Sequence, residues 1–160
     1  MTENVTEREY NQTIKMECII IMSIIKNQVL DNSFRITVVC IDEYEKKIPH
    51  GRIYNNYLEK GVEFTGVIDL LKKIELLLEE MNCPQSFSER RVFRPSNIPL
   101  KTSQTDDDVK EGKLATFSIR LLFRQNASWQ GSVTWHEGRT EESFRSVLEL
   151  LLLVDSALTE

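Results

Sequence analysis

Apolar and polar positions along this chain form two blocks with the same pattern, eighty residues apart. Gly51-Arg52-Ile53-Tyr54 has its counterpart in Gly131-Ser132-Val133-Thr134, and residues 51–80 align with residues 131–160 without a gap. The identical positions include Gly51/Gly131, Phe64/Phe144, Val67/Val147, Leu70/Leu150, Leu71/Leu151 and Leu78/Leu158, which are glycine or apolar. A fixed internal period indicates a repeated structural unit. The pattern therefore predicts an internal duplication.

The first block predicts two strands followed by a helix. Residues 34–42 are rich in Ile, Thr and Val and predict a strand, residues 43–50 a charged turn, and residues 51–58 the paired strand. Residues 62–64 are either a short strand or the entry to a helix. Between residues 66 and 82, apolar side chains recur at steps of three and four, which predicts a helix with one continuous apolar stripe.

The second block predicts the same order of elements. Residues 116–123 alternate between apolar and polar side chains as a half-buried strand does, and residues 131–135 form its partner after a turn at 125–131. The helix is predicted over residues 142–158. Its leucines lie on more than one side, which is typical of a helix buried twice, against the first helix or against another subunit.

These elements predict an α+β fold in which two pseudo-twofold β-β-α repeats form one antiparallel sheet, with both helices packed on one face. Residues 1–33 are expected to be an N-terminal extension. The first repeat occupies residues 34–83, a connecting segment residues 84–113, and the second repeat residues 114–160. The two repeats are expected to share one core and thus to form a single domain.

Composition is that of an ordinary soluble globular protein, with 41% hydrophobic and 28% charged residues. A formal net charge of -5 gives no general attraction to nucleic acid or anionic lipid. Three widely spaced cysteines and two histidines make no zinc or disulfide pattern, so neither a metal nor a cofactor is expected. The apolar run at residues 18–25 is shorter than the ~20 residues that span a bilayer. We expect a cytoplasmic protein with no membrane partner.

The most unusual segment is the polar, aromatic stretch at residues 123–131, where a hairpin tip is predicted. The residues proposed to bind a partner or ligand there are Arg120, Arg124, Gln125, Asn126, Trp129 and Trp135. Arginine and aromatic side chains on a sheet can hold phosphates and stack bases, which suggests nucleic acid or a nucleotide phosphate. The alternative is a tight hairpin in which Gln125 and Asn126 satisfy backbone groups and Trp129 packs against a helix.

A second basic cluster consists of Arg90, Arg91 and Arg94, beside Phe87 and Phe93. It is a candidate anion site, although exposed arginines more often form solvated or ion-paired surface. Catalytic residues are not expected, because His50 and His136 lack a paired base and nucleophile in the sequence.

The segments Leu122–Gly131 and Phe144–Leu150 resemble a family of small uncharacterised proteins from clostridia and related Firmicutes. Gly51-Arg52-Ile53-Tyr54 and the Pro84-Gln85 segment are also similar to that family. The resemblance covers residues 34–160 and implies a bacterial, intracellular protein, but it implies no activity and no catalytic residue.

The function that these patterns favour is a non-enzymatic cytoplasmic adaptor or regulatory protein that acts through protein–protein contacts. The expected partner is a second copy of the chain, in a homodimer, or another protein. The leucine-rich second helix and the apolar run at residues 18–25 motivate this prediction. A nucleic-acid or nucleotide-phosphate binding module is the alternative.

Overall fold

The computed structural model describes residues 32–86, 91–94, 100 and 110–159. Contacts divide the chain into two units, Met1–Ser33 and Phe34–Glu160, and the second unit contains the sheet and both α-helices. After a short 3-10 helix at Asn32–Arg35, the elements are β1 (Ile36–Glu45), β2 (Ile48–Tyr54), β3 (Val62–Thr65), α2 (Gly66–Met81), β4 (Ala115–Phe123), β5 (Gln130–Trp135), β6 (Thr140–Phe144) and α3 (Val147–Leu158).

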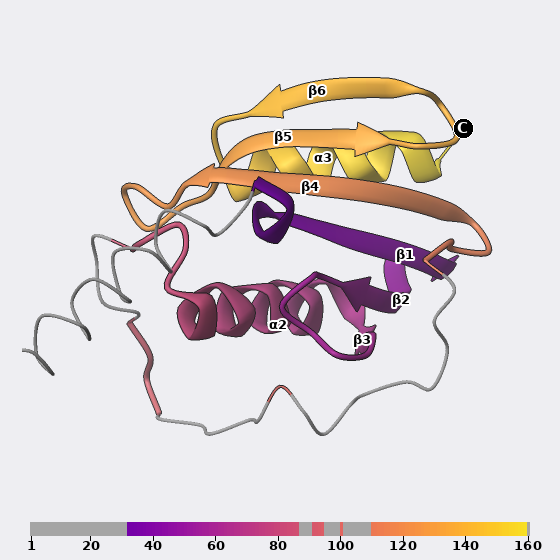
Figure 1. Ribbon diagram of the computed structural model, residues 1–160. Helices are drawn as coiled ribbons and strands as arrows, with labels where there is room; N and C mark the ends of the chain where they lie inside the picture. The colour runs from indigo at the N-terminus through magenta and orange to yellow at the C-terminus, as the bar shows by residue number, and fades with distance from the viewer. Residues whose placement is uncertain (1–31, 87–90, 95–99, 101–109, 160) are drawn as a thin grey trace, which may run out of the picture. The chain divides into compact units, whose positions relative to one another are not determined.

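All six strands form one antiparallel sheet in the order β3-β2-β1-β4-β5-β6 (Figure 1). The first strands of the two halves, β1 and β4, pair at the centre, and each half adds its two further strands outward. The predicted α+β class, antiparallel sheet and pair of helices are confirmed. Among the described helices, none combines the length and the apolar character that a bilayer span requires.

The prediction of β-β-α units is wrong in one respect, because each half contains a third strand. Residues 62–65 form β3, and residues 140–144, most of which were assigned to the second helix, form β6. In β6 only Phe144 is buried, so this edge strand has no apolar alternation that could indicate it. The helix α3 begins five residues later than predicted, at Val147.

The charged turn predicted at residues 43–50 is also wrong, because strands β1 and β2 continue into it. Only Lys46 and Lys47 form the turn, with φ angles of 51° and 65°. Two consecutive residues with positive φ make the primed turn that matches the twist of a hairpin. Asn and Gly are the usual signals of such a turn, so two lysines concealed it from the sequence.

The strand registers of the two halves agree at the spacing of eighty residues. Ile41 pairs with Gly51 and Leu121 pairs with Gly131, and a β-bulge follows each of these pairs. A Cβ atom on either glycine would collide with a backbone carbonyl of the neighbouring strand. In the central pair of strands, Val38 lies opposite Ser118, the residue eighty positions later.

Both helices begin with a carboxylate that accepts a backbone N–H. The N–H of Thr65 donates to Asp69 Oδ2 at 3.0 Å, and the N–H of Arg145 donates to Glu149 Oε2 at 2.7 Å. In α3 the Ser146 hydroxyl adds a conventional N-cap, accepting from the N–H of Glu149 at 3.2 Å. The Ser146 contact satisfies an N–H group that the first turn of a helix leaves unpaired, and the two carboxylate contacts fix the chain just before each helix.

Candidate functional site

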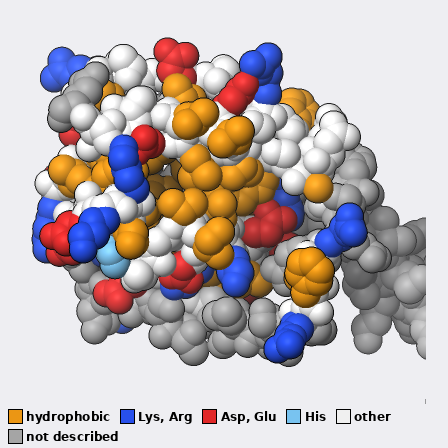
Figure 2. All heavy atoms as spheres, turned by 180° about the vertical axis from the view of Figure 1, so that it is seen from behind, with side chains coloured by type: hydrophobic (Ala, Val, Ile, Leu, Met, Phe, Trp, Pro, Cys, Tyr) orange, Lys and Arg blue, Asp and Glu red, His pale blue; other side chains and the backbone are white. Residues whose placement is uncertain are grey.

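An apolar groove lies between helices α2 and α3, with a volume of about 340 Å³. Its floor is made by Val39 and Ile41 of β1 and by Phe117 and Ile119 of β4, the two central strands. Figure 2 shows hydrophobic side chains gathered in this hollow on one face of the molecule. We call this side of the sheet the groove face and the opposite side the far face.

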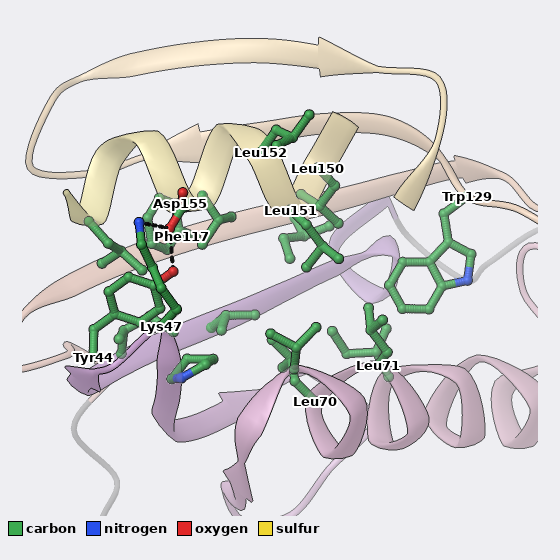
Figure 3. Close-up of a pocket in the computed structure, with 18 residues that line it drawn as sticks. Tyr44, Lys47, Leu70, Leu71, Phe117, Trp129, Leu150, Leu151, Leu152 and Asp155 are labelled. Carbon is green, nitrogen blue, oxygen red and sulfur yellow. Dashed lines mark hydrogen bonds and ion pairs between the residues drawn. The ribbon is translucent and has the colours of Figure 1, made fainter. Parts of the chain in front are cut away.

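The walls of the groove come from one stripe of each helix (Figure 3). The wall residues are Val67, Leu70, Leu71 and Ile74 of α2 and Leu150, Leu151, Val154 and Leu158 of α3. A six-stranded sheet is roughly 29 Å wide at ~4.8 Å per strand, whereas two helices of 10–12 Å cover about 20–24 Å. The central strands are therefore left with a strip that neither helix covers.

Large apolar side chains stand exposed on the two helices that border the groove. Ile68 of α2 and Leu148 of α3 are both 66% exposed, and Leu152 of α3 is 60% exposed. Ile68 and Leu148 are eighty residues apart and occupy equivalent positions of the two blocks. Large apolar side chains exposed beside an apolar groove are typical of a binding surface. We call these three residues the groove rim.

One end of the groove is closed by a polar cluster of Tyr44, Lys47 and Asp155 (Figure 3). The Tyr44 hydroxyl and the Lys47 ammonium both donate to Asp155 Oδ1, the latter at 2.7 Å. Burial and the contact with Asp155 raise the pKa of Tyr44 from 10.0 to about 12. Hydrogen bonds from Lys47, which has the larger effect, and from Tyr44 lower the pKa of the Asp155 carboxyl.

Trp129 lines the groove near its other end and belongs to a second cluster, with Arg124 and Glu75. Glu75 of α2 accepts from the Arg124 guanidinium with Oε1 and from Trp129 Nε1, at 2.7 Å, with Oε2. Arg124 also donates to the carbonyl oxygen of Pro84 at 3.3 Å and is 4% exposed. The helix of the first half is thus fixed to the β4–β5 hairpin of the second.

These two clusters occupy equivalent positions in the two halves. Glu75 and Asp155 are eighty residues apart, and so are Arg124 and Tyr44. In each case a carboxylate on the helix of one half binds the hairpin of the other half. Sequence reasoning missed these carboxylates, because a single acidic residue on a predicted helix is ordinarily solvated. Their alignment across the repeat was the available signal.

Of the proposed binding residues, Arg124 and Trp129 are brought together, but as a buried contact with Glu75. Their polar groups face that carboxylate, so this pair does not form an exposed surface for phosphates or bases. The contact matches the alternative prediction, in which Trp129 packs against a helix. Gln125 is exposed, and the Gln130 side chain bonds both its backbone N–H and its carbonyl oxygen, while Asn126 is a turn residue with a φ angle of 54°.

Arg120 and Trp135 lie on opposite faces of the sheet. Trp135 pairs with Phe117 across β4 and β5 and faces a smaller hollow that Leu153 and Ala157 of α3 also line. Arg120 pairs with Ser132 and therefore lies on the far face. The predicted surface that combined Arg120 with both tryptophans does not form.

Arg91 and Arg94 of the second basic cluster are exposed, and Phe93 beside them is fully exposed. Arg90 lies outside the described residues. In the described part of the chain, neither Arg91 nor Arg94 has an ion pair. Nothing in this part of the structure gathers them around a common point.

Ser118 and His136 make the contact that most resembles catalytic chemistry, with 2.7 Å between Ser118 Oγ and His136 Nε2. A nucleophile and base of this kind also require a group that orients the imidazole and donors for an oxyanion. Among the described residues, no hydrogen bond to the other ring nitrogen of His136 is present, and no group of three metal-ligating side chains is found. The contact alone does not constitute a catalytic site.

No protein-family model, curated protein or solved structure matches the chain. The resemblance to a clostridial protein family therefore stays a prediction.

Proposed function

We propose that the chain consists of two copies of one β-β-β-α unit, related by a pseudo-twofold axis that passes between Val38 and Ser118. Three observations support this proposal: the matching strand registers, the matching carboxylates at the helix starts, and the reciprocal clusters around Glu75 and Asp155. Both helices then cover the groove face of the sheet. Each half completes its packing only with the other half.

We further propose that the protein is a small non-enzymatic adaptor or regulatory protein that acts by protein–protein contact. The observation that carries this proposal is the apolar groove with its exposed rim, because a soluble chain rarely exposes such a surface without a partner for it. The partner we propose is a second copy of the chain, docked groove face to groove face.

Internal symmetry favours a second copy as the partner. A twofold dimer uses the same surface on both subunits, which must therefore complement itself. The pseudo-twofold axis places Ile68 and Leu148 as equivalents on the two sides of the groove, so Ile68 of one copy can meet Leu148 of the other. Leu152 has no apolar counterpart in the first half, where Lys72 stands, and it can insert between helices α2 and α3 of the facing copy.

Charge does not oppose this contact. Two carboxylates near the rim are already paired: Asp69 with Lys73 of the same helix at 2.9 Å, and Glu149 with Arg145, just before α3, at 2.6 Å. Burying each rim side chain is worth about 1–2 kcal/mol, since each is already partly buried. Six such side chains in a dimer contribute about 6–12 kcal/mol, similar to the ~4–15 kcal/mol cost of association. The rim thus only about offsets the cost of association, so we expect a weak, reversible dimer rather than a permanent one.

The test is sedimentation equilibrium of the full chain from low micromolar to several hundred micromolar concentration. We expect a concentration-dependent monomer–dimer equilibrium that Ile68→Glu combined with Leu148→Glu abolishes without loss of helical circular dichroism. Val92→Glu, which places the same charge at an exposed apolar residue outside the groove, is the matched control. A wild-type protein that stays monomeric throughout this range would refute the homodimer.

A further inference from the structure

Arg120 has an unusual position on the far face of the sheet. Its Nε atom is buried and has no hydrogen-bond partner, and no ion pair of Arg120 occurs among the described residues. A guanidinium group offers five N–H donors and stays charged at any physiological pH. A buried donor of this kind is normally matched by an acceptor.

The first half of the chain contains a related arrangement, an arginine in the corresponding cross-strand pair, with its acceptor present. Arg52 pairs with Cys40 across strands β1 and β2. Eighty residues later, the corresponding pair is Ser132 with Arg120, across β4 and β5. Each half thus has one arginine in this pair, on the outer strand in the first half and on the central strand in the second. The arginine of the first half is bound at both ends of its fork by Asp42, with Nε–Oδ2 at 3.1 Å and Nη2–Oδ1 at 3.0 Å.

The second half lacks this carboxylate. The residue equivalent to Asp42 is Leu122, which follows the same strand position at the second β-bulge and is 37% exposed. The site on the far face therefore keeps the cation and has lost the anion. An arginine fork is suited to bind two oxygens of one carboxylate or phosphate.

Hydroxyl groups surround this position. Ser132 lies directly opposite Arg120, and Ser143 lies opposite Ser132 on β6. Ser118 lies two residues from Arg120 on the same face of β4. Hydroxyls can donate further hydrogen bonds to an anion. The nearest acidic residue in the register on this face is Glu141, opposite Thr134 on the next row of the sheet, and it has no ion pair with Arg120.

We propose that Arg120, with Ser132 beside it, binds an oxyanion, the carboxylate or phosphate group of a small ligand, at the position that Asp42 fills in the first half. This site lies on the opposite face of the sheet from the groove. It does not depend on the proposed dimer, and either proposal can fail without the other.

The test is a titration of the full-length protein at low ionic strength with inorganic phosphate and, separately, with sodium acetate, followed by amide chemical shifts. We expect saturable shifts centred on Arg120 and Ser132, with a dissociation constant in the millimolar range. Arg120→Gln should weaken binding at least about tenfold, because the charged fork is lost. Arg139→Gln removes an exposed arginine of the β5–β6 turn and should leave the titration unchanged.

Leu122→Asp gives the second half its own carboxylate. The tethered group competes at a high effective concentration, so this variant should no longer bind either anion and should melt at a higher temperature. Saturation by phosphate alone would assign the site to phosphorylated ligands, and saturation by acetate alone to carboxylates. The proposal is overturned if neither anion gives saturable shifts, or if Arg120→Gln or a folded Leu122→Asp variant titrates like the wild type.

Discussion

The strongest prediction concerns Glu75, which joins helix α2 to the hairpin of the other half. Its two oxygens accept from Arg124 and from Trp129, and the Arg124 side chain is only 5% exposed. Glu75→Ala leaves a buried guanidinium without its counterion and a buried indole N–H without its acceptor. Removing one partner of a buried ion pair costs about 3–5 kcal/mol.

The lower part of this range applies, because the Glu75 side chain is 24% exposed and water can partly replace it. We expect Glu75→Ala to reduce the free energy of unfolding by about 3 kcal/mol and Tm by about 10 °C. Urea unfolding followed by circular dichroism measures the first quantity and a thermal scan the second. Glu80→Ala, on an exposed position of the same helix, is the control and should change stability by less than about 0.5 kcal/mol.

A double-mutant cycle separates this ion pair from a general loss of packing. Arg124→Ala alone removes the buried charge, so Glu75→Ala added to it should cost much less than Glu75→Ala in the wild type. We expect a coupling energy of about 2 kcal/mol between the two positions. The reasoning is refuted if Glu75→Ala costs less than about 1 kcal/mol or if the two changes are additive.

Three further predictions test other parts of the fold. Because Tyr44 has a folded-state pKa of about 12 against 10.0 for the free side chain, its contribution is complete below pH 10 and is lost as pH rises to 12. Urea unfolding should show that the advantage of the wild type over Tyr44→Phe shrinks by about 1 kcal/mol in this window, less than the full shift in pKa implies, because solvent screens a partly exposed phenol. Gly131→Ala should destabilise by about 2–4 kcal/mol, more than Gly66→Ala at about 1 kcal/mol, since only the first forces a backbone collision; denaturant midpoints give the order. Arg124 and Glu75 are the counterparts of Tyr44 and Asp155, so the double variant Tyr44→Arg with Asp155→Glu places the same arginine–glutamate pair at the other end of the groove. The thermal midpoint of this double variant should equal or exceed the midpoints of the two single variants.

The sequence predicted those parts of the fold that depend on a local, repeated signal. Helix α2 follows from an apolar stripe at steps of three and four, and it ends at Met81 as that stripe does. Strand β4 follows from the alternation of apolar and polar side chains between Phe117 and Leu121. The sequence offered β3 as one of two alternatives for residues 62–64, but β6 could not be predicted, because an edge strand needs only one buried residue, here Phe144, and takes its remaining stability from backbone pairing.

The candidate site was harder to predict because its partners are distant in sequence. Arg124 and Trp129 are recognisable as unusual residues of a polar hairpin, but the carboxylate they bind lies on the helix of the other half, about fifty residues earlier. Nor does the sequence show the groove, because it arises from the widths of a sheet and two helices rather than from any residue type. What the sequence did contain was the spacing of eighty residues, which relates Glu75 to Asp155.

The proposed duplication turns each half into a reference for the other. Features that both halves keep, such as the bulge glycines and the carboxylates at the helix starts, are those that folding requires. Exposed positions at which the halves differ are free of that requirement and are the better candidates for function. Leu122 in place of Asp42 releases an arginine on the far face, and Leu152 in place of Lys72 adds an apolar side chain beside the groove. On this argument the second half supplies the distinctive residue of each proposed surface, Leu152 beside the groove and Arg120 on the far face, while Ile68 of the first half completes the groove rim.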